Sequence, residues 1–263
     1  MKFTVEGRDA FAATGGRPFD PARPALVFVH GAGMDHTVWT LQTRYFAHHG
    51  WSVLALDLPG HAGSAGPALQ DVPAMAAWVR SAAAAAGAER FALVGHSLGA
   101  LIALEAAVEG ALGLAMLGAA AAMPVNPALQ AAADGGDHGA VEAMVGWGFG
   151  RPAQIGGNRA PGSWASGAGL RTLERGLKGP LGVDLKASNG YAGAKEAAAR
   201  VSCPVLILAG DDDRMTPLKG AKDLAGAFAH ATLQVLPATG HMMSIERSDE
   251  TLDALRDFLK GMA

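Results

Sequence analysis

The chain has 263 residues, half of them hydrophobic, which is enough apolar material for one large domain with a buried core. Its 21 basic and 24 acidic residues are well mixed and leave a net charge of −3, which argues against nucleic acid or a membrane surface as a partner. The single cysteine, Cys203, excludes a disulfide framework and a zinc site built from several thiolates. Because the N-terminal residues lack the apolar core of a secretory signal, we expect a cytoplasmic protein.

Apolar runs typical of buried parallel strands alternate with helical patterns along the first half of the chain. These patterns predict strands at 25–29, 52–56, 91–94 and 112–117, helices at 38–49, 72–86 and 100–107, and an edge strand at 2–6. The alternation resumes late in the chain, with strands at 204–209 and 232–236 and helices at 218–229 and 248–260. This order predicts an α/β fold with a doubly wound, mostly parallel sheet.

The alternation breaks between residues 124 and 200, where we find no clear apolar strand among many glycines. This stretch is too long for a plain loop, so we expect an inserted helical cap on a core formed by residues 1–123 and 201–263. The cap is either a small helical subdomain with no role at the site or a lid over an apolar pocket, and we favour the lid. The residues expected to line this pocket are Met144, Trp147 and Trp164 of the cap and Gly31, Gly33 and Met242 of the core.

The segment Gly95-His96-Ser97-Leu98-Gly99 stands between a predicted strand and a predicted helix. Without Cβ atoms, Gly95 and Gly99 allow the strand and the helix to approach closely around a sharp turn. Such a turn exposes the Ser97 hydroxyl at a helix N-terminus, which favours negative charge. The pentapeptide alone is a weak signal in a chain with 36 glycines, but its flanks make Ser97 a candidate nucleophile.

A serine nucleophile needs a base to take its proton, and the ligand site of such a sheet lies at the carboxyl ends of its strands. Of the nine histidines, His241 stands at such an end, between the last strand and the last helix, and is the candidate base. His30 and His61 occur at the same edge, where we favour hydrogen bonds that hold the loops. We expect His96 to be structural, because its side chain should project away from Ser97.

The third group of such a site is a carboxylate that orients the imidazole. Three consecutive aspartates, Asp211, Asp212 and Asp213, follow the predicted strand 204–209. The strand that ends at Leu117 is followed by no carboxylate. The acid is therefore expected among these three aspartates, although a solvated acidic turn is the alternative interpretation.

Taken in order, these pieces resemble the α/β-hydrolase fold superfamily over nearly the whole chain. Five segments carry the resemblance: His30-Gly31-Ala32-Gly33, Asp57 to Ser64, Gly95 to Gly99, Gly210 to Pro217, and Gly240-His241. One departure is Ala62, which replaces the second glycine of the family's usual Gly-His-Gly-x-Ser loop.

The resemblance implies roles for individual residues. Ser97 corresponds to the nucleophile and His241 to the base, and the family's spacing from glycine to proline selects Asp213 as the acid. The backbone N–H groups of Ala32 and Leu98 correspond to the oxyanion hole, with Gly33 as the alternative to Ala32. The resemblance implies no metal and no organic cofactor.

The function implied is that of a serine hydrolase that cleaves a small carboxylic ester or lactone through an acyl-enzyme on Ser97. Its rate should fall as the pH drops through the range in which histidine becomes protonated. One alternative is a C–C bond hydrolase of the meta-cleavage-product type, for which Arg151, Asn158 and Arg159 would hold a substrate carboxylate. Another alternative, of a different class, is a small-ligand-binding protein of the same fold with negligible turnover.

Overall fold

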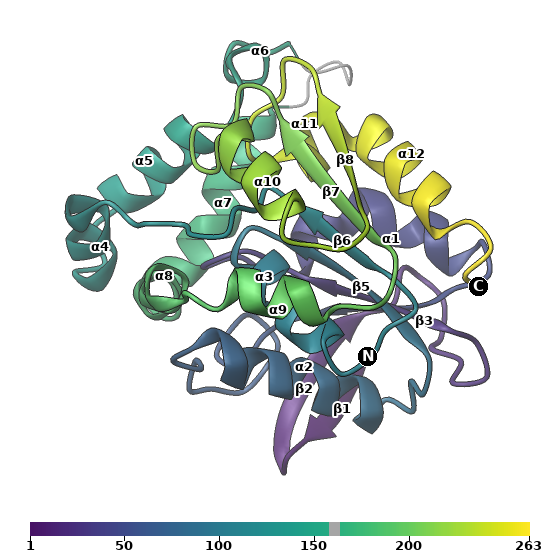
Figure 1. The fold of residues 1–263 in the computed structure, drawn as a ribbon. Helices are drawn as coiled ribbons and strands as arrows, with labels where there is room; N and C mark the ends of the chain where they lie inside the picture. Colours follow the sequence, from purple (N-terminus) through teal and green to yellow (C-terminus); the bar gives the residue numbers. More distant parts are fainter. Residues whose placement is uncertain (158–163) are drawn as a thin grey trace.

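An eight-stranded sheet forms the centre of the protein in the computed structural model, which describes residues 1–157 and 164–263 (Figure 1). Its strands are β1 (Lys2–Val5), β2 (Arg8–Ala13), β3 (Ala25–Val29), β4 (Ser52–Leu56), β5 (Phe91–His96), β6 (Leu114–Leu117), β7 (Val205–Gly210) and β8 (Ala231–Leu236). They lie in the order β1-β2-β4-β3-β5-β6-β7-β8, with β1–β2 and β2–β4 antiparallel and the other pairs parallel. The predicted fold class is confirmed.

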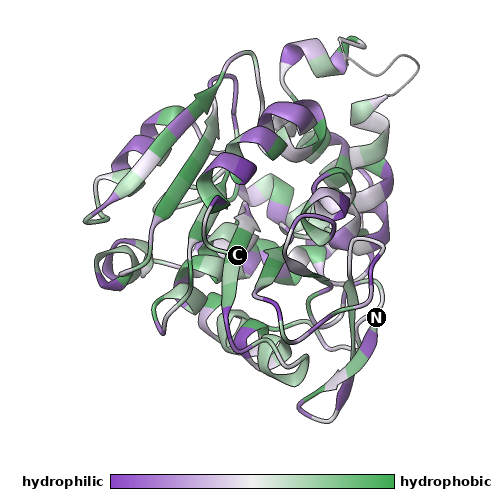
Figure 2. Ribbon diagram, turned by 90° about the vertical axis from the view of Figure 1, so that its right-hand side faces the viewer, coloured by the Kyte–Doolittle hydropathy of each residue, from purple (hydrophilic) through white to green (hydrophobic). Residues whose placement is uncertain are grey.

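The inner strands β3 to β7 are buried along their entire length, as the continuous apolar runs predict. Hydrophobic colours accordingly dominate the interior strands in Figure 2, while hydrophilic residues lie on the outer helices. The edge strand β8 is largely exposed and alternates instead. The sequence reading did not predict β2, whose first residues are charged and exposed.

Helices cover both faces of the sheet (Figure 1). The helices α2 (Val72–Ala85), α3 (Leu98–Ala107), α9 (Ala194–Arg200) and α10 (Leu218–Ala225) pack in sequence along one face. The other face carries α1 (Thr40–Ala47), α11 (Met243–Glu246) and α12 (Ser248–Leu259). The helix predicted at 38–49 divides into the 3-10 helix η1 (His36–Trp39) and α1, because Asp35 caps the earlier start through the N–H of Thr37.

Six helices of the described chain lie between β6 and β7, and we call the first five of them the inserted helices. They are α4 (Pro127–Asp134), α5 (Gly139–Gly148), α6 (Arg151–Gln154), α7 (Ala165–Leu177) and α8 (Leu181–Gly190). They pack on one another and lie together beyond one end of the sheet (Figure 1), whereas α9 packs on α3 and α10. A cap would therefore consist of α4 to α8, with α9 beside the core. In the described ranges, no helix is long and apolar enough to cross a membrane.

The close approach of α3 to the sheet depends on two glycines. A Cβ on Gly95 would lie 2.1 Å from the carbonyl oxygen of Gly99, and a Cβ on Gly99 would lie 2.3 Å from those of Val29 and His30. Backbone atoms would have to move to admit either side chain. The helix α3 is buried along almost its whole length, so little space is available for such a movement.

We therefore expect Gly99→Ala to lower the free energy of unfolding by about 2 kcal/mol or more, because the new methyl group meets backbone oxygens. Urea unfolding followed by circular dichroism measures this change. Gly146→Ala on α5 is the matched control, because a Cβ there meets open space. An unchanged unfolding midpoint for Gly99→Ala would contradict the steric argument.

Candidate active site

Ser97 alone links β5, which ends at His96, to α3, which begins at Leu98. Its backbone has φ of 54° and ψ of −123°, a conformation that is unfavourable for a residue with a side chain. The Ser97 N–H donates to the carbonyl of Leu117 on β6 at 2.9 Å, which holds the turn against the sheet. Because α3 begins at Leu98, the N–H of Leu98 has no acceptor within the helix. A serine hydroxyl and a free helical N–H thus lie side by side.

His241 and Asp213 form a buried pair at the ends of β8 and β7. His241 Nδ1 donates to Asp213 Oδ2 at 2.9 Å, and the Thr216 hydroxyl donates to the same oxygen at 2.6 Å. The other oxygen of Asp213 accepts from the N–H groups of Met215 and Thr216. Burial alone would raise the pKa of Asp213, but His241 and Thr216 outweigh burial and lower it. An ionised Asp213 keeps the proton on Nδ1 and leaves Nε2 available as a base.

The neighbouring aspartates have other partners. Asp211 accepts from the N–H of Thr239 at 3.3 Å, and Asp212 accepts from the N–H of Arg151 at 3.0 Å. Among the three consecutive carboxylates, Asp213 is the one that contacts His241. The structure therefore brings together His241 and the aspartate selected by the family resemblance.

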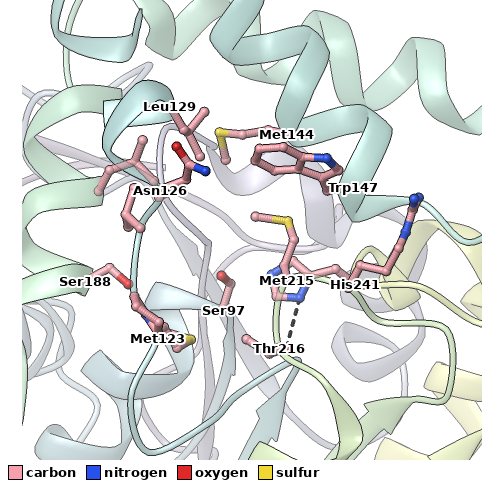
Figure 3. A pocket seen from close by; sticks show the side chains of 15 residues that line it. Ser97, Met123, Asn126, Leu129, Met144, Trp147, Ser188, Met215, Thr216 and His241 are labelled. Carbon is pink, nitrogen blue, oxygen red and sulfur yellow. Dashed lines mark hydrogen bonds between the residues drawn. The ribbon is translucent and has the colours of Figure 1, made fainter. Parts of the chain in front are cut away.

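The free nitrogen of His241 faces the space around Ser97. Nε2 is buried and has no hydrogen-bond partner among the described residues, and His241 and Ser97 line the same cavity (Figure 3). The ring packs against Gly118, where a Cβ would lie 2.9 Å from Nδ1. A bond between a serine and its base is often long until substrate binds, so this arrangement suits proton transfer.

Other histidines at this edge hold loops, as the sequence analysis expects. His96 Nε2 donates to the carbonyl of His241 at 2.9 Å. His30 Nε2 accepts from the N–H of Leu58 at 3.1 Å, so its Nδ1 carries the proton and donates to the carbonyl of Gly31. These bonds tie the segment after β3 to the segment after β4, and the end of β5 to the segment after β8.

One cluster in the described residues, Asp35, His36 and Asp57, has ligand atoms close enough for a metal ion. Its carboxylates already have partners. Asp35 pairs with Arg175 and caps Thr37, while Asp57 accepts from the backbone and the ring of His36. Because both carboxylates are occupied by these bonds, we interpret the cluster as an anchor between two loops.

The segment Gly31–Met34 forms a tight turn beside Ser97. The N–H of Met34 donates to the carbonyl of Gly31 at 3.2 Å, and Gly33 has φ of +66°, as the third residue of a type II turn requires. The N–H of Gly33 donates to the Asp184 carboxylate of α8 at 2.8 Å and is therefore engaged. Ala32 is the residue of this turn that lines the cavity of about 480 Å³ together with Ser97.

Two cavities meet at Ser97, and Met144 lines both. The larger has a volume of about 480 Å³ and runs beneath α5, with Met144 and Trp147 above Ser97 in Figure 3. Its lining is mainly apolar, with Asn126, Ser188 and Arg214 among the polar members. The smaller has a volume of about 10 Å³ and a mostly apolar lining that includes Phe149, Leu173 and Met242. The site thus offers a roomy side and a tight side.

The residues expected to line the pocket are placed unequally. Met144, Trp147 and Met242 line one or both cavities, but Gly31, Gly33 and Trp164 are not part of either lining. Trp164 is 62% exposed. Gly31 packs against His96 and the Cβ of Ser97, and Gly33 packs against Leu181.

Sequence reasoning missed several lining residues, among them Met123, Leu129, Leu185, Ser188 and Met215. Only Met215 carried a usable signal, because it stands two residues after the expected acid. Of the cap residues considered for a substrate carboxylate, Arg151 is exposed and outside both linings, and Asn158 and Arg159 lie outside the described residues.

The sequence profile described as the alpha/beta hydrolase family matches residues 26–254. The chain belongs to this family. RutD of Shigella flexneri, whose name marks it as a candidate carbamate hydrolase, is 28% identical to this hydrolase over 91% of each chain.

Two solved structures share the fold of this alpha/beta hydrolase. The enol-lactonase from Burkholderia xenovorans LB400 superposes with a TM-score of 0.87 at 21% identity, covering 98% of this chain and 99% of the other. A thermophilic esterase from Thermogutta terrifontis superposes with a TM-score of 0.82 at 19% identity, covering 100% of this chain and 98% of the other. Both similarities extend through the inserted region as well as the core.

The buried histidines predict a dependence of stability on pH. Burial and the neighbouring His241 lower the pKa of His96 to about 3. Burial and the neighbouring His61 lower the pKa of His30 to about 4. Below about pH 6.5 the unfolded chain binds protons that these two folded imidazoles do not bind, so their contribution to the free energy of unfolding decreases as the pH falls. His36 and His61, whose pKa values are raised, contribute in the opposite direction.

His96 alone should contribute a loss of about 2 kcal/mol between about pH 7 and about pH 5. His96→Gln keeps an N–H donor for the carbonyl of His241 and should remove this part of the dependence. Urea unfolding at both pH values measures the difference. His230→Gln, at an exposed position, is the control, and an unchanged pH slope in His96→Gln would contradict the assignment.

Proposed function

We propose that this alpha/beta hydrolase cleaves a small carboxylic ester or lactone, with Ser97 as nucleophile, His241 as base and Asp213 as orienting acid. One observation carries the proposal. In the described part of the chain, the buried His241–Asp213 pair leaves Nε2 without a hydrogen-bond partner at the cavity that Ser97 lines. A strained serine, an oriented imidazole and a carboxylate, which follow β5, β8 and β7 at one edge of the sheet, have no evident structural purpose.

The chemistry follows from these groups. Ser97 Oγ attacks the substrate carbonyl while His241 Nε2 takes its proton. The N–H groups of Ala32 and Leu98 donate to the oxyanion that forms. The intermediate collapses as His241 returns the proton to the leaving alcohol, and water activated by His241 then hydrolyses the acyl-enzyme. Asp213 stays ionised throughout and stabilises the imidazolium.

The inserted helices α4 to α8 serve as the cap in this proposal and determine which substrate fits. The names of the relatives span an esterase, an enol-lactonase and a candidate carbamate hydrolase, and each of these reactions involves attack on a carbonyl. The cation that lines the larger cavity, Arg214, already donates to the carbonyls of Gly146 and Phe149. The described lining therefore favours a neutral ester over the carboxylate-bearing substrate of a C–C bond hydrolase.

Ser97→Ala should abolish covalent labelling by a fluorophosphonate probe and lower kcat on p-nitrophenyl esters at least about 10³-fold, because the attacking oxygen is gone. Asp213→Asn should lower kcat by about 10⁴-fold, because a neutral amide no longer selects the required tautomer. Gel fluorescence and steady-state kinetics measure both effects.

Asp212→Asn is the matched control, because its carboxylate binds a backbone N–H of α6 and not the imidazole. Its kcat should stay near that of the wild type. Trace hydrolysis that survives Ser97→Ala unchanged would favour the alternative of a small-ligand-binding protein. Cleavage of a coloured ring-fission product in preference to every ester would favour the C–C bond hydrolase.

The tight cavity predicts a preference for short acyl groups when a p-nitrophenyl group occupies the roomy side. Leu173 is buried and lines the tight cavity, so Leu173→Ala should widen it. We expect the ratio of kcat/KM for hexanoyl to acetyl esters to rise by about 10-fold, within the range for filling an apolar pocket. Leu170→Ala, elsewhere on α7 and outside both linings, is the control. An unchanged ratio in Leu173→Ala would exclude the acyl group from the tight cavity.

A further inference from the structure

Asp184 of the inserted helix α8 is fully buried, although the proposed reaction does not use it. Its Oδ2 accepts from the N–H of Gly33 at 2.8 Å and from His61 Nε2 at 2.9 Å. Gly33 belongs to the turn beside Ser97, and His61 belongs to the loop after β4. Burial of a carboxylate is unfavourable unless its partners compensate, so these two contacts are strong constraints on both loops.

The imidazole of His61 is protonated where it contacts Asp184. Its Nδ1 lies 3.1 Å from the carbonyl oxygen of Pro59 and 3.2 Å from that of Leu58, and carbonyls only accept. Both ring nitrogens therefore donate, which requires an imidazolium. Burial alone would lower the pKa of His61, but the hydrogen bond and charge of Asp184 outweigh burial and raise it.

The surroundings of His61 agree with a cation at this position. The ring of His30 lies 4.7 Å away, and His30 accepts a backbone N–H through Nε2, which makes it neutral. The buried pair is thus a cation from the core matched with an anion from the insertion.

Both peptides that flank Ala32 are held by side chains. The carbonyl of Gly31 accepts from His30 Nδ1 at 2.9 Å, and a planar trans peptide directs the Ala32 N–H away from that carbonyl. The next peptide donates its N–H, that of Gly33, to Asp184. The central peptide of a β-turn can face either way, since types I and II differ in its orientation. The bond to Asp184 favours the orientation in which Gly33 has positive φ.

We propose that Asp184 is a positioning residue for the oxyanion hole, holding the Gly31–Met34 turn from α8, together with His61, so that the Ala32 N–H faces the carbonyl attacked by Ser97. This inference rests on the proposed function, because it concerns the donor of that reaction. It also implies that the oxyanion hole is complete only when α8 is correctly placed.

A second contact between the inserted helices and the same loop supplies a matched comparison. Arg175 of α7 forms an ion pair with Asp35 at 2.6 Å, and its Nε donates to the same oxygen at 2.8 Å. Asp35 directly follows the turn, but Arg175 binds its side chain and not the turn peptides. Arg175→Met therefore loosens the docking of the insertion without releasing Gly33.

Asp184→Asn should lower kcat on p-nitrophenyl acetate by about 10- to 100-fold, with KM within about threefold of wild type, because a misdirected donor weakens transition-state binding. Arg175→Met should leave both constants near wild type. Equal losses in the two variants, or a loss confined to KM, would overturn the positioning role. Ser97→Ala belongs in the same series. Hydrolysis that does not depend on Ser97 refutes the proposed function, whereas Ser97-dependent hydrolysis with unchanged kcat in Asp184→Asn refutes only this inference.

Amide hydrogen exchange of Gly33, followed by nuclear magnetic resonance, tests the contact without any substrate. Exchange should accelerate in Asp184→Asn and stay slow in Arg175→Met, and slow exchange in both would overturn the inference. Thermal unfolding shows whether Asp184→Asn folds. If it does not, His61→Gln tests the same pair by changing the partner that belongs to the core. It should lower kcat in the same direction as Asp184→Asn, and a wild-type kcat in folded His61→Gln would also overturn the inference.

Discussion

The close contact between α3 and the sheet is the constraint on which the rest of the site depends. Because Gly95 and Gly99 have no Cβ, the backbone of the helix start touches the ends of β3 and β5. Ser97 is thereby confined to a turn with positive φ, and the first N–H of α3 is left without an acceptor. In the proposed mechanism, the nucleophilic hydroxyl and one oxyanion donor therefore both depend on this single backbone contact. The other residues of the candidate site lie on loops that pack around this contact.

Much of the fold was predictable because its signals are local. A buried parallel strand requires a continuous apolar run, and each of β3 to β7 has one. The strand ends then identify Ser97, the aspartates after β7 and His241 without knowledge of any long-range contact. By contrast, β2 begins with charged, exposed residues and pairs only at the edge of the sheet, so its pattern is weak.

The lining of the site was much less predictable than its reactive centre. Leu185 and Ser188 of α8 reach the cavity through the packing of the inserted helices on one another. Trp164 is an aromatic residue of the same region, yet it is 62% exposed. Composition alone does not distinguish the residues that line the cavity from an exposed residue such as Trp164. Asp184 was equally hidden, because one acidic residue in a helix gives no sign that it is buried against a loop 151 positions earlier.

The hydrogen bonds around the end of α5 have a consequence for the proposed reaction. The carbonyl of Gly148 accepts the N–H groups of His241 and Met242, and Glu246 joins Gly150 to Gly240. The backbone of His241 is therefore hydrogen-bonded to the end of α5, which is one of the inserted helices. A displacement of this helix end would break the hydrogen bond from the His241 N–H to the carbonyl of Gly148. In the proposed mechanism, the position of the base thus depends on the inserted helices as well as on the sheet.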